Sequence, residues 1–209
     1  YRANPGFNPS LTRAGPLGNL YRYNDMVQAP VGSKRRAIGV QFEFPADWLQ
    51  LDRSIGGIQY VDQRNGDKLY VFRAPLPDNT TTLATISKST IGDYIFNPEA
   101  SLAKSGQTIE DYKVTSAQIL SEDSCSSSLS STSTSTSLCG AIRRRFKIKY
   151  ATVTGNGLRV ERRALVDAYQ VDNDIYMLMT SSNAVKFEQA NSLERETVEK
   201  IVASFRIDI

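Results

Sequence analysis

The stretch RRRFKIKYATVTGNGLRVERRALVDAYQVDNDIYMLMT, residues 143–180, contains the pattern that decides the fold. In its first part, apolar and basic residues alternate with the period of two that is typical of a half-buried β-strand. Turn-forming residues at 155–157 and 172–174 divide the stretch into three segments. The predicted strands are residues 143–153, 157–170 and 175–180. Strands joined by such short turns pair antiparallel, so a meander of antiparallel strands is the expected centre of the fold.

The register of the first two strands can be predicted because only one turn length matches apolar residues across the ribbon. A three-residue turn, 155–157, sets Phe146 opposite Val166, whereas a two-residue turn sets apolar residues opposite charged ones. The other expected pairs are Thr154 with Leu158, Ile148 with Ala164 and Thr152 with Val160. The same register sets Lys149 opposite Arg163, and like charges directly across a ladder destabilise it. The pair indicates either an acidic partner surface or a solvated basic strand face.

Basic residues gather in two zones of the sequence. Residues 143–163 contain eight Lys and Arg against Glu161 alone, and residues 1–36 contain six against Asp25 alone. Such zones favour an acidic partner, whereas the low net charge of +3 and the lack of an RNA-binding aromatic pattern or Cys/His finger argue against nucleic acid. The candidate partner-binding residues are Arg13, Arg22, Lys34, Arg35, Arg36, Arg143, Arg145, Lys147, Lys149 and Arg163.

The N-terminal region differs in composition from the rest of the chain. Residues 1–36 hold four prolines and four glycines without a helical or strand period, which predicts an extended basic arm. The folded domain is expected over residues 37–209. It starts with a strand in which Val40, Phe42 and Phe44 alternate with polar residues.

Further elements complete an α+β prediction. Asn65-Gly66 between two β-branched and aromatic runs predicts a hairpin, and residues 113–120 are a further expected strand. Asn97-Pro98 predicts the start of a short helix at about residues 98–105, preceded by a polar loop. Ser192 begins a terminal helix with one apolar stripe. We therefore expect an antiparallel sheet flanked by helices.

A Ser/Thr-rich insertion interrupts the domain at residues 121–140. Eleven of the thirteen residues between Cys125 and Cys139 are serine or threonine, so the tract cannot supply core and is expected to be a mobile surface loop. We expect a disulfide between the two cysteines, which would close this loop and contribute roughly 3 kcal/mol in the chain-entropy model. Two unrelated free thiols are the alternative.

The absence of histidine closes off most conventional catalytic chemistry. A Ser-His-Asp or Cys-His group and a carboxylate-histidine zinc site are excluded by composition. Asp167, Asp172 and Asp174 lie near one predicted turn, where they either offer oxygen ligands to a hard cation or support the turn. No constellation argues for an enzyme, and we expect no catalytic residue, no metal site and no bound cofactor.

Several short motifs, in order and with fitting gaps, resemble one known family. They are Gly39-Val-Gln-Phe-Glu-Phe-Pro-Ala-Asp-Trp48, Ile58-Gln-Tyr-Val-Asp62, Leu69-Tyr-Val-Phe72, Thr90-Ile-Gly-Asp-Tyr94, Asp174-Ile-Tyr176 and Ile201-Val-Ala-Ser-Phe205. From about residue 38 to residue 207 the sequence resembles the PsbP family, the extrinsic proteins of the thylakoid lumen. The insertion at 121–140 departs from that pattern, as does Phe187, where many members carry tryptophan.

The resemblance implies a fold and a role. The fold is an antiparallel sheet sandwiched by helices, which agrees with the prediction from the residues. The role is a non-catalytic extrinsic subunit on the lumenal side of photosystem II, in the chloroplast thylakoid lumen and peripheral to the membrane. The implied partners are the photosystem II core and other lumenal extrinsic subunits. Calcium and chloride are then retained at the partner's oxygen-evolving manganese-calcium cluster rather than bound by this chain.

Two other functions are compatible with the same sequence. One is a lumenal assembly factor or a photosystem I associated protein, because one fold hosts paralogues with different roles. The other is a small-ligand-binding module. Its pocket could be lined by tyrosines that otherwise pack in the core, namely Tyr60, Tyr70, Tyr112, Tyr150 and Tyr169.

Overall fold

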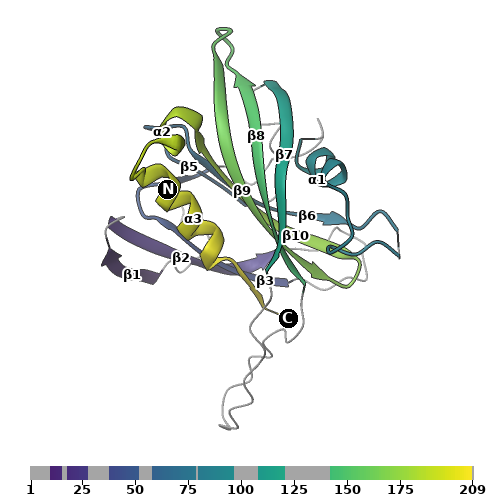
Figure 1. Ribbon diagram of the computed structural model, residues 1–209. Helices are drawn as coiled ribbons and strands as arrows, with labels where there is room; N and C mark the ends of the chain where they lie inside the picture. The colour runs from purple at the N-terminus through teal and green to yellow at the C-terminus, as the bar shows by residue number, and fades with distance from the viewer. Residues whose placement is uncertain are drawn as a thin grey trace.

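The computed structural model describes residues 10–15, 18–27, 38–51, 58–78, 80–96, 108–120 and 142–208. Their strands form two sheets, and helices lie on both sides of the long strands of the larger sheet (Figure 1). The strand pairs of both sheets are antiparallel. The α+β class and the antiparallel sheet flanked by helices, expected from the sequence, are confirmed.

The larger sheet has seven strands in the order β4-β5-β6-β10-β9-β8-β7. Their bounds are β4 (Leu49–Gln50), β5 (Ile58–Val61), β6 (Lys68–Pro75), β7 (Thr108–Leu120), β8 (Arg143–Val153), β9 (Arg159–Val171) and β10 (Asp174–Asn183). The three strands predicted over residues 143–180 are β8, β9 and β10, which are neighbours in the sheet. The predicted meander is therefore confirmed.

The predicted register is also confirmed. Phe146 pairs with Val166, and Lys149 pairs with Arg163. The backbone N–H of Thr154 donates to the carbonyl of Leu158 at 3.0 Å, which closes the three-residue turn. Phe146 and its partner Val166 are both fully buried, and a slip of β8 by one residue would move Phe146 to the face on which Lys147 and Lys149 are exposed.

The hairpin predicted from Asn65-Gly66 consists of β5 and β6, which pair up to Val61 and Lys68. Gly66 has a φ of +66°, in the left-handed region that glycine adopts without steric cost. The Asp62 carboxylate accepts a hydrogen bond from the backbone N–H of Arg64 at 2.9 Å. Glycine and the aspartate together explain why the chain turns here.

The smaller sheet corrects the prediction for the N-terminal region. The sequence predicts an arm outside the domain over residues 1–36, yet β1 (Ser10–Gly15) and β2 (Gly18–Val27) form strands. They join β3 (Ile38–Pro45) and β11 (Arg206–Asp208) in the order β1-β2-β3-β11. A strand can add to the edge of β3 through backbone hydrogen bonds without alternating apolar and polar residues. The composition of residues 1–36 therefore does not indicate these strands.

Two hydrophobic cores lie on opposite faces of the seven-stranded sheet. On one face, side chains such as Leu165 and Leu178 pack with β3 and with the last helix. On the other face, Phe146, Ile148 and Met177 pack with a helix that follows β6. Strand alternation assigns neighbouring residues to different cores, so β9 and β10 are buried on both sides.

The sequence predicts a polar loop before position 97, whereas the structure has the helix α1 (Lys88–Phe96) there. Ser87 Oγ accepts a hydrogen bond from the backbone N–H of Thr90 at 3.1 Å, which is the bonding of a helix cap. Thr90 and Gly92 are poor helix formers, and packing on the sheet compensates. A Cβ at Gly92 would stand 2.8 Å from the Tyr112 ring, so only glycine lets α1 approach β7 this closely.

Two helices cover the other face of the sheet, α2 (Ala184–Glu188) and α3 (Leu193–Ser204). The predicted apolar stripe of the terminal helix is confirmed, since Val198, Ile201 and Val202 are buried. Ser192 is its N-cap and accepts a hydrogen bond from the backbone N–H of Arg195 at 3.0 Å. The helix therefore begins where the sequence predicts it.

We expect Ser192→Ala to lower the free energy of unfolding by about 1 kcal/mol, because one N–H of the first turn of α3 loses its acceptor. Ser192→Thr keeps a hydroxyl at the cap and should lose clearly less. Urea denaturation of the wild type and both variants measures the difference. Equal losses in the two variants would contradict a capping role for the hydroxyl.

Several predictions lie outside the described residues. These are the helix at 98–105, the insertion at 121–140, the pairing of Cys125 with Cys139, and the contacts of Lys34, Arg35 and Arg36. In the described part of the chain, no helix combines the length and apolarity that a membrane crossing requires.

Candidate functional site

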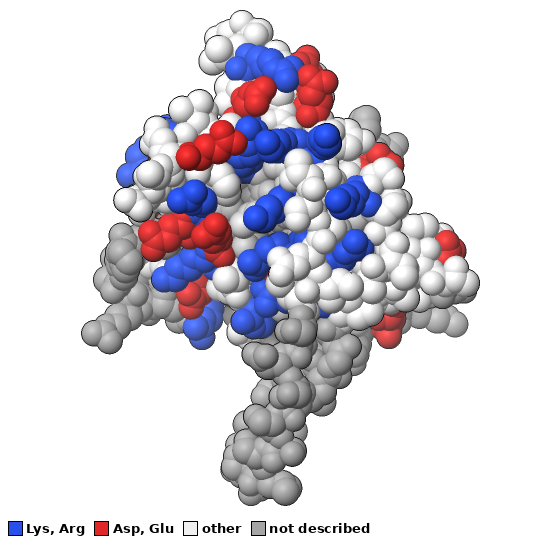
Figure 2. Space-filling model, viewed as in Figure 1, with Lys and Arg blue, Asp and Glu red and all other residues white. Residues whose placement is uncertain are grey.

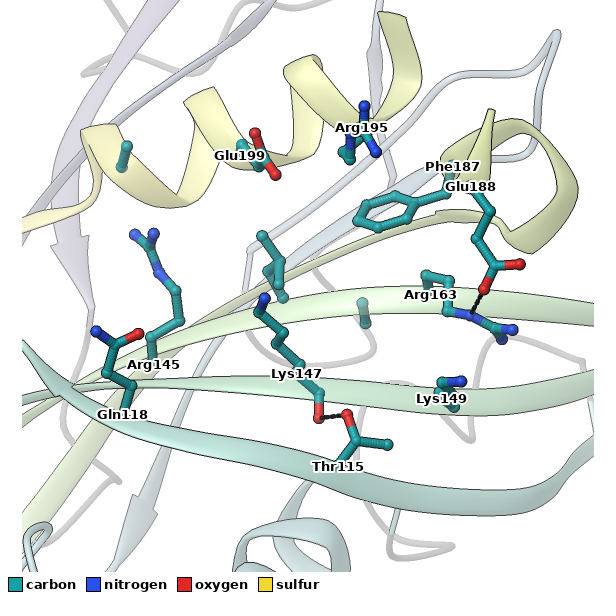
Figure 3. Close-up of a pocket in the computed structure, with 13 residues that line it drawn as sticks. Thr115, Gln118, Arg145, Lys147, Lys149, Arg163, Phe187, Glu188, Arg195 and Glu199 are labelled. Atoms are coloured by element: carbon teal, nitrogen blue, oxygen red, sulfur yellow. Dashed lines mark hydrogen bonds and ion pairs between the residues drawn. The ribbon is translucent and has the colours of Figure 1, made fainter. Parts of the chain in front are cut away.

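A cleft of about 860 Å³ lies between α2 and α3 on one side and the strands β7, β8 and β9 on the other (Figure 3). Its charged lining residues are Arg145, Lys147, Lys149, Arg163, Glu188, Arg195 and Glu199. The remaining lining residues are Thr115, Gln118, Ala164, Leu165, Phe187 and Ala203. Five basic residues against two acidic ones make the lining positive.

The cleft exists because α3 covers only part of the sheet. The helix packs mainly on β3, β9 and β10, so the same face of β7 and β8 stays uncovered. Strand alternation then decides the chemistry of the open face. Phe146 and Ile148 point into the core on the far side, and the residues between them point toward α3.

Three cations of the cleft have no acidic partner among the residues that the structure describes. Lys147 and Lys149 are exposed, Arg195 is half-buried, and none of the three forms an ion pair within the described part of the chain. Figure 2 shows Lys and Arg side chains gathered over the middle of this face, with acidic groups beside them. Unpaired cations lining a concave surface attract anionic partners and raise their local concentration.

Like charges stand in register across three strands here. Lys149 of β8 pairs with Arg163 of β9 and, on its other side, with Lys113 of β7. Glu188 of α2 accepts a hydrogen bond from Arg163 Nε at 2.7 Å, which offsets part of the repulsion. Lys113 and Lys149 have no such acidic partner within the described residues. A bound anion would therefore relieve the repulsion between their charges.

Arg143 and Arg145 are anchored by a carboxylate inside the protein. Asp167, fully buried on β9, accepts a hydrogen bond from Arg143 Nε at 3.0 Å and from Arg145 Nη2 at 2.8 Å. The hydrogen bond to Asp167 raises the pKa of Arg145. Arg143 Nη2 also donates to the carbonyl of Val202 in α3 at 3.0 Å, so this cluster ties the last turns of α3 to the sheet.

The structure thus brings together four of the ten candidate partner-binding residues, namely Arg145, Lys147, Lys149 and Arg163. Arg143 lies beneath α3, Arg22 lies on β2 and pairs with Glu43 at 2.9 Å, and Arg13 belongs to β1. Sequence reasoning missed the helix side of the cleft. Phe187, Arg195 and Glu199 lack a shared motif, although Arg195 and Glu199 are four residues apart on one face of α3.

The structure bears on two sites that the sequence left open, a cation site formed by aspartates and a pocket lined by tyrosines. Asp167 serves the arginine cluster and Asp174 forms a buried ion pair with Arg73, and no cluster of metal-binding side chains occurs among the described residues. The five tyrosines do not converge on one pocket. Tyr60 and Tyr169 pack in one core, whereas Tyr70 and Tyr150 pack in the other.

A second polar cluster is buried at the hairpin end of the sheet. Asp67 is 4% exposed, and its Oδ1 lies 4.0 Å from Arg162 Nη1. Burial raises the pKa of Asp67 to about 6, against the opposing charge of Arg162. Burial also lowers the pKa of Lys68 to about 8, and the charge of Arg162 adds to this shift. The folded state therefore disfavours the charged forms of both groups.

We expect Asp67→Asn to stabilise the protein by about 1–3 kcal/mol near pH 7.5 and by much less near pH 4. The pKa of Asp67 is higher in the folded than in the unfolded chain, so stability falls as pH rises from about 4 through 6, and asparagine removes that loss. Thermal unfolding of both proteins at the two pH values measures the effect. A gain that is equal at both pH values would contradict titration of Asp67.

Comparisons with known proteins bear on the fold. No family model matches the sequence, and no curated protein matches it. Among solved structures, the chain is similar to the solution structure of cyanobacterial PsbP (CyanoP) from Synechocystis sp. PCC 6803. The identity is 16%, the TM-score is 0.52, and the match covers 94% of this chain and 98% of that chain.

A second match is LpqN of Mycobacterium tuberculosis, which is described as involved in cell envelope biogenesis. The identity is 11%, the TM-score is 0.41, and the match covers 90% of this chain and 92% of that chain. The likeness to the Synechocystis protein supports a PsbP-like fold for this chain and, at its low identity, leaves family membership and role to other evidence.

Proposed function

We propose that this chain is a non-catalytic extrinsic subunit on the lumenal side of photosystem II. It stabilises the oxygen-evolving manganese-calcium cluster there and helps to retain calcium and chloride. The observation that carries the proposal is the basic cleft on a PsbP-like fold, in which Lys147, Lys149 and Arg195 form no ion pair with any described residue. The thylakoid lumen is the compartment that this role requires, and the photosystem II core and other extrinsic subunits are the partners.

A docking role suits the chemistry of the cleft. Its lining offers cations, two carboxylates and a few apolar side chains, and the sequence contains no histidine to act as a base near neutral pH. Lys147 and Lys149 of the open face are exposed, which favours recognition of an acidic surface by complementary charge. The ions stay with the partner complex in this proposal.

The test is rebinding to salt-washed photosystem II membranes. Saturable co-sedimentation that lowers the calcium and chloride needed for oxygen evolution is the expected result. A chain that stays in the supernatant, or that binds photosystem I membranes instead, overturns the proposal and favours the photosystem I or assembly role. Binding that weakens steadily with added salt identifies the contact as electrostatic.

A further inference from the structure

We propose that the cleft holds one extended acidic segment of a partner protein, running along β8 with a carboxylate at every second residue. This inference rests on the docking role proposed for the cleft and specifies what docks. It follows from the spacing of the cations, from the apolar groups between them, and from the two carboxylates of the lining.

The spacing of the cations matches an extended chain. Lys147 and Lys149 are two residues apart on β8 and point to the same face, so their Cα atoms lie roughly 6.7 Å apart. An extended peptide repeats its side chains on one face with the same period. Carboxylates at alternate positions therefore meet both lysines at once, whereas a helix presents neighbours on one face at a different spacing.

The helix side of the cleft adds a further cation and an apolar contact. Arg195 of α3 stands across the cleft from the strands, and the Phe187 ring points into the space between them (Figure 3). Leu165, which is buried at 5% exposure, contributes apolar surface to the same lining. An apolar side chain of a peptide can pack there between the acidic ones.

The carboxylates of the cleft discriminate among anionic partners. Glu199 is exposed and forms no ion pair within the described part of the chain, and Glu188 lies at the Phe187 end of the cleft. Both repel a phosphate backbone, which carries one charge per nucleotide. A peptide can instead direct backbone N–H groups toward them. The mixed lining therefore favours an acidic peptide over nucleic acid.

The experiment is fluorescence polarisation at low salt with the whole chain and three labelled probes. The first is a short peptide alternating glutamate and threonine with one central leucine. The second has the same composition with its glutamates in one block, and the third is oligo-dT of equal charge. We expect the alternating peptide to bind at least about fivefold more tightly than either other probe.

Matched variants locate the contact. Lys147→Ala with Lys149→Ala should weaken binding of the alternating peptide about tenfold or more, because both cations are removed. Lys88→Ala with Lys200→Ala changes the net charge equally outside the cleft and should change the affinity less than about twofold. Phe187→Ala should weaken peptide binding without affecting oligo-dT.

Other outcomes overturn the inference. Equal affinity for the block peptide and the alternating peptide would contradict the match between carboxylate spacing and the two lysines. Tighter binding of oligo-dT than of the alternating peptide would indicate nucleic acid as the ligand of the cleft. A chain that rebinds photosystem II membranes yet ignores the alternating peptide leaves the proposed function standing without this inference. A chain that binds the peptide but no membrane leaves the inference standing without the proposed function.

Discussion

Asp167→Ala should lower the free energy of unfolding by about 3–5 kcal/mol. The carboxylate is fully buried and holds both Arg143 and Arg145. The two arginine side chains are 11% and 23% exposed, so neither is freely solvated once its partner is gone. The loss comes from two guanidinium groups left without their counter-charge.

Denaturant unfolding measures this loss, and two comparisons interpret it. Glu161→Ala removes an exposed carboxylate from the same strand and should cost about 0.5 kcal/mol or less. Replacing all three members of the cluster, with Arg143→Met, Arg145→Met and Asp167→Leu, should recover much of the stability because no buried charge remains. A loss below about 1 kcal/mol for Asp167→Ala would show that the arginines find water instead.

The cluster also connects stability to the cleft. Arg143 bonds both Asp167 and the carbonyl of Val202, so it holds α3 where the helix forms one wall of the cleft. Asp167→Ala should therefore weaken partner binding even at temperatures where the chain remains folded. Titration of the alternating peptide with this variant measures that coupling.

Reversing both lysines of the cleft, with Lys147→Glu and Lys149→Glu, should reduce affinity for salt-washed photosystem II membranes by about 10- to 100-fold. Both side chains are exposed, so circular dichroism should hardly change. The unfolding midpoint should not fall, because Lys149→Glu also removes the repulsion with Lys113 and Arg163. The variant also places carboxylates opposite any acidic partner surface. The difference from wild type should shrink with added salt, because screening weakens attraction and repulsion alike.

A matched charge reversal distinguishes the effect of the cleft lysines from the effect of the total net charge. Lys88→Glu with Lys200→Glu changes the total charge by the same amount at positions that do not line the cleft. We expect this control to bind within about threefold of wild type. If both reversals weaken binding equally, net charge rather than the cleft governs docking.

The sequence by itself determined the central ribbon and its basic face. Alternation from Phe146 to Tyr150 and the turn at residues 155–157 act over a few residues, so they could be analysed without the rest of the chain. The start of α3 at Ser192 was equally local, because a cap is set by the side chain and the N–H groups of the next turn. Four of the cleft's five basic residues, Arg145, Lys147, Lys149 and Arg163, followed from the same reasoning.

Only the tertiary structure decided what those residues do together. Where α3 crosses the sheet depends on long-range packing, and that crossing adds Arg195 and Phe187 to the cleft. The register of β8 and β9 sets Arg145 opposite Asp167, and the crossing of α3 gives Arg143 of the same cluster a further acceptor in the Val202 carbonyl. Pairing of β1 and β2 with β3 rests on backbone hydrogen bonds that leave no period in the sequence. Contacts between residues far apart in the chain have no local signal, and this is why the fold of the ribbon could be predicted and the site could not.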